Sequence, residues 1–462
     1  MTERRDVTGL VVFRAAFGLL VAVSAVRFLA YGWVDDLFTS TGSFQFRYWA
    51  FAWVPQLDAA WLKPAFAALA VLGLMVSAGL FYRFAIAAVF VLFTWLQLYD
   101  VTNYLNHYYL VSLLALLMTF MPLARAGSLD VWRRPALRLD TFPAWCTFVL
   151  RFQVGTVYFF AGLAKLNADW LLHAQPLNIW LSARTHLPVV GPWLDERAVA
   201  YAAAWAGFLF DTTAPLFLSL KRTRPYFYVA VLGFHAATWV LFPIGMFPFI
   251  MVTAALVFFD PVKRPNGAEP HSGPRDAGVN FGATRASAPL HVEPPRGSKV
   301  LVALLAMWCA VQVALPLRAH LYDGDVSWHE QGMRFSWRVM TREKNGSVTF
   351  IVTQRSTGRR WEVDPGARLT RLQERELSSQ PDLIWQFAQS LGAEWRARGI
   401  DDVEVRADAL ASLNGRPAAR LIDPNVDLLT VTDGLGAKRW ILPSPTGEPI
   451  HLKALTARRG PP

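Results

Sequence analysis

The sequence predicts a polytopic α-helical membrane protein with about nine transmembrane helices and a C-terminal soluble domain that is β-rich or α+β. Its 462 residues are 54% hydrophobic and 17% charged, whereas soluble domains carry about 25% charged residues. Apolar runs recur between Leu10 and Leu317, and the chain from Arg318 onward has the composition of a soluble protein. The positive charges lie between the apolar runs, which is typical of a membrane topology.

Each expected span is a run of about 20 mostly apolar residues, the length that a helix needs to cross a bilayer. The runs lie near residues 9–31, 62–82, 83–101, 107–124, 143–164, 198–220, 225–242, 245–261 and 298–317. The first run is long and has no small-residue cleavage pattern before Tyr31. We therefore expect a membrane helix there and no cleavable signal peptide.

Lysine and arginine in the short loops predict the orientation, because cytoplasmic loops carry an excess of both. The clusters are Arg4 and Arg5, then Arg125 with Arg133, Arg134 and Arg138, then Lys221 with Arg222 and Arg224, and finally Lys263 with Arg264. With the spans above, all these clusters fall on one side, which we assign to the cytoplasm. The N-terminus is then cytoplasmic, while the C-terminal domain and the loops at 100–107 and 165–197 face outward.

Composition divides the chain into a membrane domain (residues 1–261), a cytoplasmic linker rich in Pro and Gly (262–297), a last membrane helix (298–317) and an extracytoplasmic domain (318–462). In the last of these, strands are expected at Ser347–Gln354, Arg360–Val363, Val403–Val405, Arg420–Ile422 and Arg439–Leu442. An amphipathic helix is expected at Pro381–Arg398, where apolar residues recur at helical spacing.

The cysteines and the distribution of positive charge indicate which disulfides and which partners to expect. Cys146 and Cys309 both lie inside apolar runs, so we expect no disulfide framework. The net charge of +11 would suit a nucleic-acid partner, but the basic residues do not form one stripe. We therefore expect the lipid bilayer, and no nucleic acid, as a partner.

Ionisable side chains at membrane depth are costly and are candidate functional residues. They are Arg14, Arg27, His107, Arg151, Lys165, Asp211 and His235. A structural role is favoured for Arg14 and Arg27, which can pair with a carboxylate or extend toward the interface. Arg151 and Asp211 either neutralise one another and fix helix positions or take part in function.

Lys165 is the most informative of these residues, because it ends the aromatic and small-residue run that starts at Val157. A lysine at the outer end of a span commonly extends to the interface. An apolar setting, however, favours the neutral amine, which can accept a proton. The sequence therefore leaves both an anchoring and a catalytic interpretation open.

Two histidines accompany this lysine in the predicted spans. His107 opens a span on the same outward side as Lys165, so it is either an interfacial anchor or part of one site with Lys165. His235 precedes a turn that contains Pro243 and Pro248. Such an interruption at membrane depth is tolerated only inside protein or beside a cavity.

The chain has no phosphate loop, no serine triad and no histidine spacing typical of a metal site, so no metal is expected. The residues alone indicate an outward-facing apolar pocket with a candidate base and a candidate imidazole. They do not name a reaction.

The segment Val157–Trp170 resembles the most characteristic segment of the vitamin K-dependent gamma-glutamyl carboxylase family, whose membrane part is called the HTTM domain. Other family-like stretches are Asn106-His107 with Leu113–Leu116 and Thr119–Met121, His235 with Leu241-Phe242 and Ile244–Phe247, Leu209–Asp211, and in the tail Trp328, Gly332, Phe335–Trp337 and Asp423–Asp427. The likeness runs in order along most of the chain.

The resemblance implies that O₂ oxidises reduced vitamin K (phylloquinol or menaquinol) to the 2,3-epoxide, while a peptidyl glutamate loses its γ-proton and adds CO₂. It implies that Lys165 deprotonates the quinol and that His107 supports the oxygenation step. We expect the quinone and substrate site to include Asn106, Arg151, Tyr158, Trp170, Asp211, His235 and Met246. The implied partners are a glutamate-containing secreted peptide and a quinone-epoxide reductase.

The chain departs from the animal enzymes of this family, because it stops soon after Asp427 and carries Ala164-Lys165 where the family has two lysines. Its many Arg, Ala and Trp residues suggest a bacterial inner-membrane protein. The alternative function is a non-enzymatic HTTM protein that binds quinone or lipid, or assists maturation of a secreted peptide. A transporter is disfavoured, since the spans show no inverted repeat.

Overall fold

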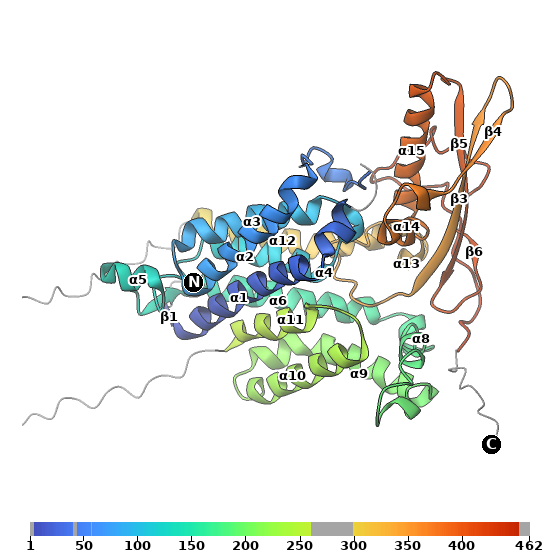
Figure 1. Ribbon diagram of the computed structural model, residues 1–462. Coiled ribbons are helices and arrows are strands. Elements are labelled where there is room, and N and C mark those ends of the chain that lie inside the picture. The colour runs from blue at the N-terminus through green and yellow to red at the C-terminus, as the bar shows by residue number, and fades with distance from the viewer. Residues whose placement is uncertain (1–3, 40–43, 57, 260–298, 452–462) are drawn as a thin grey trace, which may run out of the picture.

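The computed structural model describes residues 4–39, 44–56, 58–259 and 299–451. The predicted linker at 262–297 lies outside these residues. A bundle of long helices forms one part of the molecule, and a sheet with packed helices forms the other (Figure 1).

A helix lies at each of the predicted apolar runs. These helices are α1 (Thr8–Ala30), α2 (Leu62–Ala78), α3 (Tyr82–Leu98), α4 (Asn106–Thr119), α6 (Ala144–Lys165), α9 (Arg197–Ser219), α10 (Arg224–Leu241), α11 (Phe247–Ala255) and α12 (Lys299–Leu317). Within the described ranges, length and composition suit 4 of the helices to crossing a membrane, at Thr8–Ala30, Ala59–Ala78, Ala144–Lys165 and Lys299–Leu321. Two further apolar helices are shorter, at Tyr82–Leu98 and Phe247–Phe258. The total of about nine spans stays a prediction.

The shorter elements belong mostly to the loops and to the C-terminal domain. The helices are α5 (Leu129–Arg133), α7 (Ala168–Leu171), α8 (Leu177–Ser182), α13 (Val326–His329), α14 (Arg371–Leu377) and α15 (Pro381–Ala397). The strands are β1 (Arg4–Asp6), β2 (Thr141–Pro143), β3 (Lys344–Gln354), β4 (Arg360–Val363), β5 (Val403–Leu413) and β6 (Ala419–Arg420).

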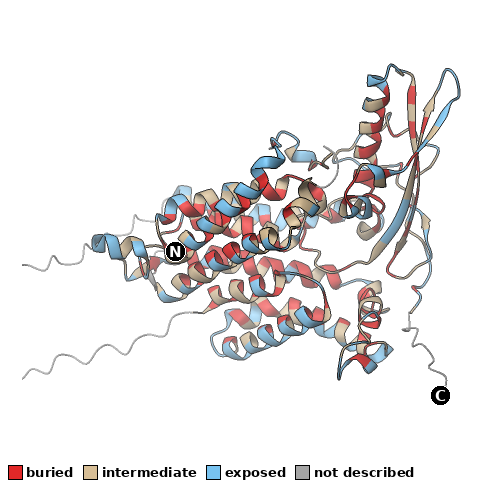
Figure 2. Ribbon diagram, in the orientation of Figure 1, coloured by how far each residue is buried: buried red, intermediate tan, exposed pale blue. Residues whose placement is uncertain are grey.

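The packing of the bundle fits a lipid environment. Buried residues face the interior of the bundle, while many exposed residues on its outer faces are apolar (Figure 2). In α12 only 17% of the apolar window is buried, although its mean hydropathy is 2.3. An apolar helix with so little burial exposes its side chains to hydrocarbon rather than to a protein core. The cysteines are both free, as the sequence predicts, with Cys146 buried and Cys309 partly exposed.

Helices α1 and α2 pack so closely that glycine is required at their contact. A Cβ atom at Gly18 would fall on backbone atoms of Gly73 and Ser77. Small residues at such crossings let two membrane helices approach, because dispersion contacts rather than the hydrophobic effect hold them together.

Gly18→Leu is therefore expected to lower the free energy of unfolding by about 1–3 kcal/mol, the usual range for overpacking. The thermal unfolding midpoint of the detergent-solubilised protein would measure this change. Gly233→Leu is the matched control, since Gly233 also lies within a helix but its Cβ would meet no atom within 4 Å. Equal midpoints for the two variants would contradict the prediction.

Several basic segments meet at one end of the bundle. Strand β1 pairs antiparallel with β2, which joins the N-terminal segment to the loop before α6. The start of α1 lies beside Phe259, because a Cβ at Gly9 would be 2.8 Å from the Phe259 carbonyl oxygen. In Figure 1 this end lies opposite the sheet. The arrangement agrees with basic loops on one side, whereas the orientation across a membrane stays a prediction.

Arg14 has a structural role, as the sequence favours. Its guanidinium donates hydrogen bonds to the carbonyl oxygens of Ser77 (3.3 Å), Leu123 (3.1 Å) and Gly127 (2.8 Å). The side chain therefore joins α1 to the ends of α2 and α4 through backbone carbonyl oxygens.

The C-terminal domain is a four-stranded antiparallel sheet in the order β4-β3-β5-β6, with α15 packed against β3 and β5. Along β5 every second residue from Val403 to Leu413 is buried, as period-2 geometry requires. The expected helix at Pro381–Arg398 is confirmed within one residue. The expected strand at Arg439–Leu442 forms only an isolated bridge at Ile441, because Pro443 and Pro445 follow at once and cannot donate to a ladder.

A partly buried ion pair attaches this domain to the bundle next to Lys165. The Asp169 carboxylate accepts hydrogen bonds from Asn414 (2.8 Å) and from two nitrogens of Arg416 (2.8 and 2.6 Å). Burial by itself would raise the pKa of Asp169, but these hydrogen bonds outweigh it and hold the pKa below its usual range. A bidentate arginine of this kind fixes geometry as well as charge.

This shift predicts a pH dependence of stability. Because the folded-state pKa of Asp169 is depressed, its contribution is complete above the unfolded-state pKa of about 3.9 and is lost as the pH falls through the folded value. Wild-type protein is thus expected to lose more stability than Asp169→Asn when unfolding midpoints at pH 3 and pH 6 are compared. Asp323→Asn, at an exposed carboxylate, should behave as wild type. Parallel pH profiles for wild type and Asp169→Asn would refute the assignment.

Candidate active site

The C-terminal end of α6 carries Lys165, which is buried in an ion pair. Its Nζ donates to Asp211 Oδ2 at 2.7 Å, and further to the carbonyl oxygens of Ala161 (3.2 Å) and Val339 (3.4 Å). Gly162 permits this pairing, because a Cβ there would lie 2.8 Å from the backbone nitrogen of Thr212 on α9. The close approach of α6 and α9 brings Asp211 to the lysine.

The residues after Lys165 fold an aromatic ring over it. Asn167 donates from Nδ2 to the Ala164 carbonyl (2.8 Å) and accepts from the Trp170 backbone N–H (3.0 Å), so it both ends α6 and caps α7. This turn sets the Trp170 ring centroid 5.1 Å from Lys165 Nζ, a distance suited to a cation–π contact. The short polar run after the lysine therefore has a specific local function.

A mostly apolar cavity of about 210 Å³ adjoins this ion pair. Its lining includes Lys165, Asp211, Trp170, Tyr158 and His235. The Tyr158 hydroxyl lies 3.3 Å from His235 Nε2, while His235 Nδ1 is buried with no partner in the part of the chain that the structure describes. A buried polar atom without a partner is costly, so Nδ1 is suited to a ligand.

His107 lines a second and larger cavity of about 930 Å³, together with Asn106 and Met246. The His107 ring is 7% exposed, and its ring neighbours are Tyr108 at 4.6 Å and Phe247 at 5.8 Å between centroids. This cavity extends from α1–α3 to residues of α14, and thus reaches from the bundle to the C-terminal domain.

The two cavities share a wall made of Phe247, Val339 and Met340, which line both. The Phe247 ring lies 5.8 Å from the ring of His107 and 5.7 Å from that of His235. His107 and Lys165 are therefore in adjoining cavities rather than in one. The sequence predicted one site for both residues, and the side chains of this wall divide it into two cavities.

Val339 and Met340 are site residues that the sequence analysis missed. They belong to the segment 330–340, which descends from the C-terminal domain and has positive φ at Phe335, Trp337 and Met340. The Phe335 N–H donates to Tyr104 Oη at 2.8 Å, and Asn106 Nδ2 donates to the Arg338 carbonyl at 3.4 Å. The family-like Phe335–Trp337 stretch was the signal that could have identified this segment.

Arg151 is the expected site residue that the structure does not bring to the others. It precedes Lys165 by about 21 Å along α6 at 1.5 Å per residue. Its Nε and one terminal nitrogen donate to the carbonyls of Val257 and Phe258, both at 2.8 Å. Asp211 pairs instead with Lys165. Arg151 thus fixes the end of α11 against α6 and lines neither cavity.

The Lys165–Asp211 contact changes the electrostatic interpretation of the lysine. Apolar surroundings alone favour a neutral amine, but a carboxylate at 2.7 Å favours the ammonium. A basic role for Lys165 therefore requires that its proton first passes to Asp211. Two buried groups in direct contact can exchange a proton without exposing either to water.

Comparison with protein families gives two matches that are adjacent in the chain. Residues 3–262 match the model of the HTTM domain. Residues 297–447 match the model described as the vitamin K-dependent gamma-carboxylase lumenal domain. No solved structure matches the chain. The HTTM match alone covers more than half of the sequence and contains both histidines, the lysine and the aspartate described above.

Proposed function

Since this chain belongs to the vitamin K-dependent gamma-carboxylase family, we propose that it is a membrane enzyme that carboxylates peptidyl glutamate. In the proposed reaction O₂ oxidises reduced vitamin K or menaquinol to the 2,3-epoxide, and the glutamate γ-carbon loses a proton and adds CO₂. The observation that carries the proposal is the buried Lys165–Asp211 pair, which opens on an apolar cavity next to the cavity of His107. Apolar helices and the lumenal-domain match fit a membrane protein with an extracytoplasmic domain.

The residues of the smaller cavity fit a quinol ring. Its walls are aromatic and aliphatic, and its polar atoms are few and convergent, as in small-molecule sites. His235 Nδ1, buried without a partner in the described chain, is suited to a quinone oxygen. At about 210 Å³ the cavity is smaller than the roughly 300–1,000 Å³ of drug-sized sites, so the isoprenoid tail must lie outside it. When bound, the reduced quinone supplies the electrons for O₂ and, through its oxidation, the strong base.

Lys165 and Asp211 handle the first proton in the proposed mechanism. The Lys165 ammonium gives its proton to Asp211 Oδ2 along their 2.7 Å hydrogen bond. The resulting amine then takes the hydroxyl proton of the quinol, so that Lys165 ends as an ammonium and Asp211 as a neutral acid. Trp170 and the Val339 carbonyl hold the nitrogen in place during both transfers.

The larger cavity is the proposed place of the glutamate peptide. It is the more polar of the two, and its lining includes Asn106, His107, the cations Arg27 and Arg375, and the carboxylates Asp36 and Glu376, the second of which pairs with Arg375. A glutamate carboxylate needs such cations, and a secreted peptide would reach this cavity from the side of the C-terminal domain. Phe247, Val339 and Met340 separate it from Lys165, which excludes water from the smaller cavity until both ligands are bound. His107 lies on the peptide side of this wall and supports the oxygenation step from there.

The proposed location is a bacterial inner membrane, with the N-terminus in the cytoplasm and the C-terminal domain outside. A quinone-epoxide reductase is the implied partner activity, because the epoxide must be reduced before another turnover.

The test is to incubate the purified protein with reduced vitamin K, O₂, labelled CO₂ and a glutamate peptide. Epoxide and acid-stable label in the peptide are the expected products. Epoxide without label would restrict the activity to quinol oxidation or point to another peptide. Absence of epoxide with either phylloquinol or menaquinol would overturn the proposal.

One observation favours the alternative of a quinone- or lipid-binding protein without activity. The three N–H groups of Lys165 have three acceptors, as in a purely structural ion pair. Such a protein would bind reduced vitamin K but leave it unoxidised. A binding measurement beside the epoxide assay therefore separates the two functions.

A further inference from the structure

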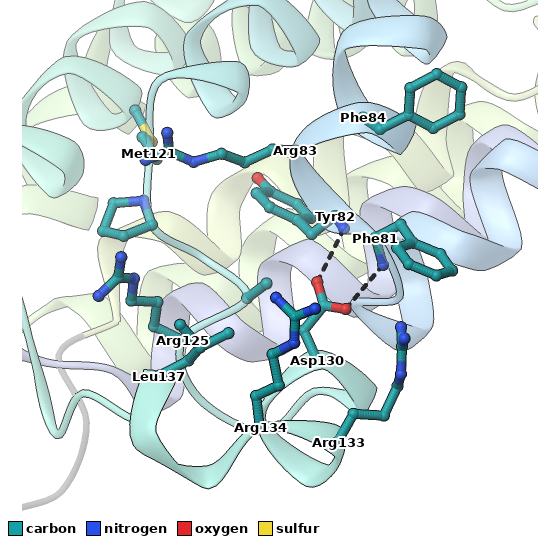
Figure 3. Close-up of a pocket in the computed structure, with 12 residues that line it drawn as sticks. Phe81, Tyr82, Arg83, Phe84, Met121, Arg125, Asp130, Arg133, Arg134 and Leu137 are labelled. Carbon is teal, nitrogen blue, oxygen red and sulfur yellow. Dashed lines mark hydrogen bonds between the residues drawn. The ribbon is translucent and has the colours of Figure 1, made fainter.

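A third cavity, lined by arginines and apolar residues, lies at the opposite end of the bundle from the C-terminal domain and takes no part in the proposed reaction. It has a volume of about 490 Å³ and lies where α3 begins, where α4 has ended and along α5. Its lining contains the guanidinium groups of Arg83, Arg125, Arg133 and Arg134 and a single carboxylate, Asp130. Figure 3 shows the arginines around the cavity, with Asp130 among them.

The single carboxylate is engaged by the protein backbone. Asp130 Oδ1 accepts from the Phe81 N–H at 2.9 Å, and Oδ2 accepts from the Tyr82 N–H at 3.0 Å (Figure 3). These are the free N–H groups at the start of α3, so Asp130 acts as a helix cap supplied from α5. The carboxylate therefore caps the N-terminus of α3 and holds α5 against this helix.

The arginines consequently exceed the acidic groups of the cavity. Arg133 stacks on the Phe81 ring, with 4.5 Å between its guanidinium carbon and the ring centroid. In the described part of the chain, the ion pairs and side-chain hydrogen bonds include none made by the guanidinium groups of Arg83, Arg125 or Arg134. Four positive charges around one capped carboxylate leave the cavity strongly positive. An anion with several oxygen acceptors would complement it.

The surroundings of the cavity indicate that this anion is attached to a membrane. Phe84, Phe120 and Trp132 lie near it in the chain and are 68%, 67% and 79% exposed. Exposed aromatic residues beside arginines are typical of the headgroup level of a bilayer. A site for a soluble anion would have no need of such an apolar border.

We propose that this cavity binds the phosphate of an anionic glycerophospholipid, with the acyl chains lying against the exposed aromatic residues. Basic pockets between membrane helices on the cytoplasmic side bind anionic headgroups by the same chemistry. Arg125 and Arg134 are the principal phosphate ligands, since neither is engaged by a protein partner. The site anchors the end of the bundle that is remote from the quinol cavity.

The test uses the full chain in mild detergent and native mass spectrometry with phosphatidylglycerol, phosphatidylcholine and free glycerol 3-phosphate as separate probes. Wild type is expected to bind phosphatidylglycerol at least about tenfold more tightly than Arg125→Gln/Arg134→Gln, the loss expected when two charge-assisted contacts disappear. Lys221→Gln/Arg222→Gln removes the same charge from another basic loop and is the matched control, expected to bind as wild type. Arg83→Gln/Arg134→Gln is a second variant, in case the first does not fold.

Three outcomes would overturn the proposal. They are equal phosphatidylglycerol binding by Arg125→Gln/Arg134→Gln and the control Lys221→Gln/Arg222→Gln, equal binding of phosphatidylcholine and phosphatidylglycerol by wild type, and full displacement of the lipid by equimolar glycerol 3-phosphate. The last would indicate a soluble phosphate ligand instead of a lipid.

Discussion

Lys165→Met is expected to lower the rate of epoxide formation by about 10²–10⁴-fold, the usual contribution of a positioned acid–base group. Methionine has a similar length and can pack against Trp170, but it loses the cation–π contact and cannot accept the quinol proton. The measurement is the initial rate of vitamin K epoxide formation at saturating reduced vitamin K. Lys63→Met is the matched control, because Lys63 is 59% exposed, pairs with Asp35 and lines neither cavity. It should keep the wild-type rate.

The same substitution leaves Asp211 buried beside an apolar side chain. Loss of one partner of a buried pair destabilises a protein by about 3–5 kcal/mol, so low activity alone would be ambiguous. Lys165→Met/Asp211→Leu removes both charges and is expected to recover the unfolding midpoint without recovering epoxide formation. Wild-type epoxide formation by either folded variant would refute the role of Lys165. Recovery of both stability and activity in the double variant would make the pair purely structural.

Phe247→Ala is expected to uncouple quinol epoxidation from glutamate carboxylation. Phe247 lies in the wall between the His107 and Lys165 cavities, and its truncation joins them and admits water to the base. Epoxide formation should continue, while label incorporated per epoxide falls by up to about 100-fold, as when reacting groups lose their alignment by about 1 Å. The ratio of labelled peptide to epoxide is the measurement.

Phe249→Ala is the control for this truncation, since Phe249 is on the same helix, is 43% exposed and lines neither cavity. It should keep the wild-type ratio of label to epoxide. An unchanged ratio in Phe247→Ala would show that the wall does not protect the base. Loss of both products together would point to damage of the quinol cavity itself.

The positions of the long helices could be predicted because each depends on signals within one short stretch. The apolar run expected at 143–164 became α6, which spans Ala144–Lys165. The number of crossings is harder to predict, since α11 is only 9 residues long and a membrane span depends on its neighbours as much as on its own length. The missing strand at Arg439–Leu442 has a local cause in Pro443 and Pro445, which the alternation of apolar residues did not reveal.

The candidate site was less predictable, because its contacts join residues that are remote in sequence. The pairing of Lys165 with Asp211 spans 46 positions, and its contact with Val339 spans 174. One interpretation of the sequence paired Arg151 with Asp211, but Arg151 precedes Lys165, the observed partner of Asp211, by about 21 Å along α6. The wall between the cavities depends on Phe247 from the bundle and Met340 from the C-terminal domain, so it exists only once the two parts have packed.

The sequence by itself determined that this is a membrane protein with a separate C-terminal domain, and it identified a lysine and a histidine at the ends of apolar runs. Hydrophobic run length and loop charge are local quantities, and they need no knowledge of packing. Only the tertiary structure decided that the lysine is paired with a carboxylate and that the histidine lies in an adjoining cavity. Both results depend on helix–helix approach and on a segment with positive φ angles, which are decided by the packing of the whole chain.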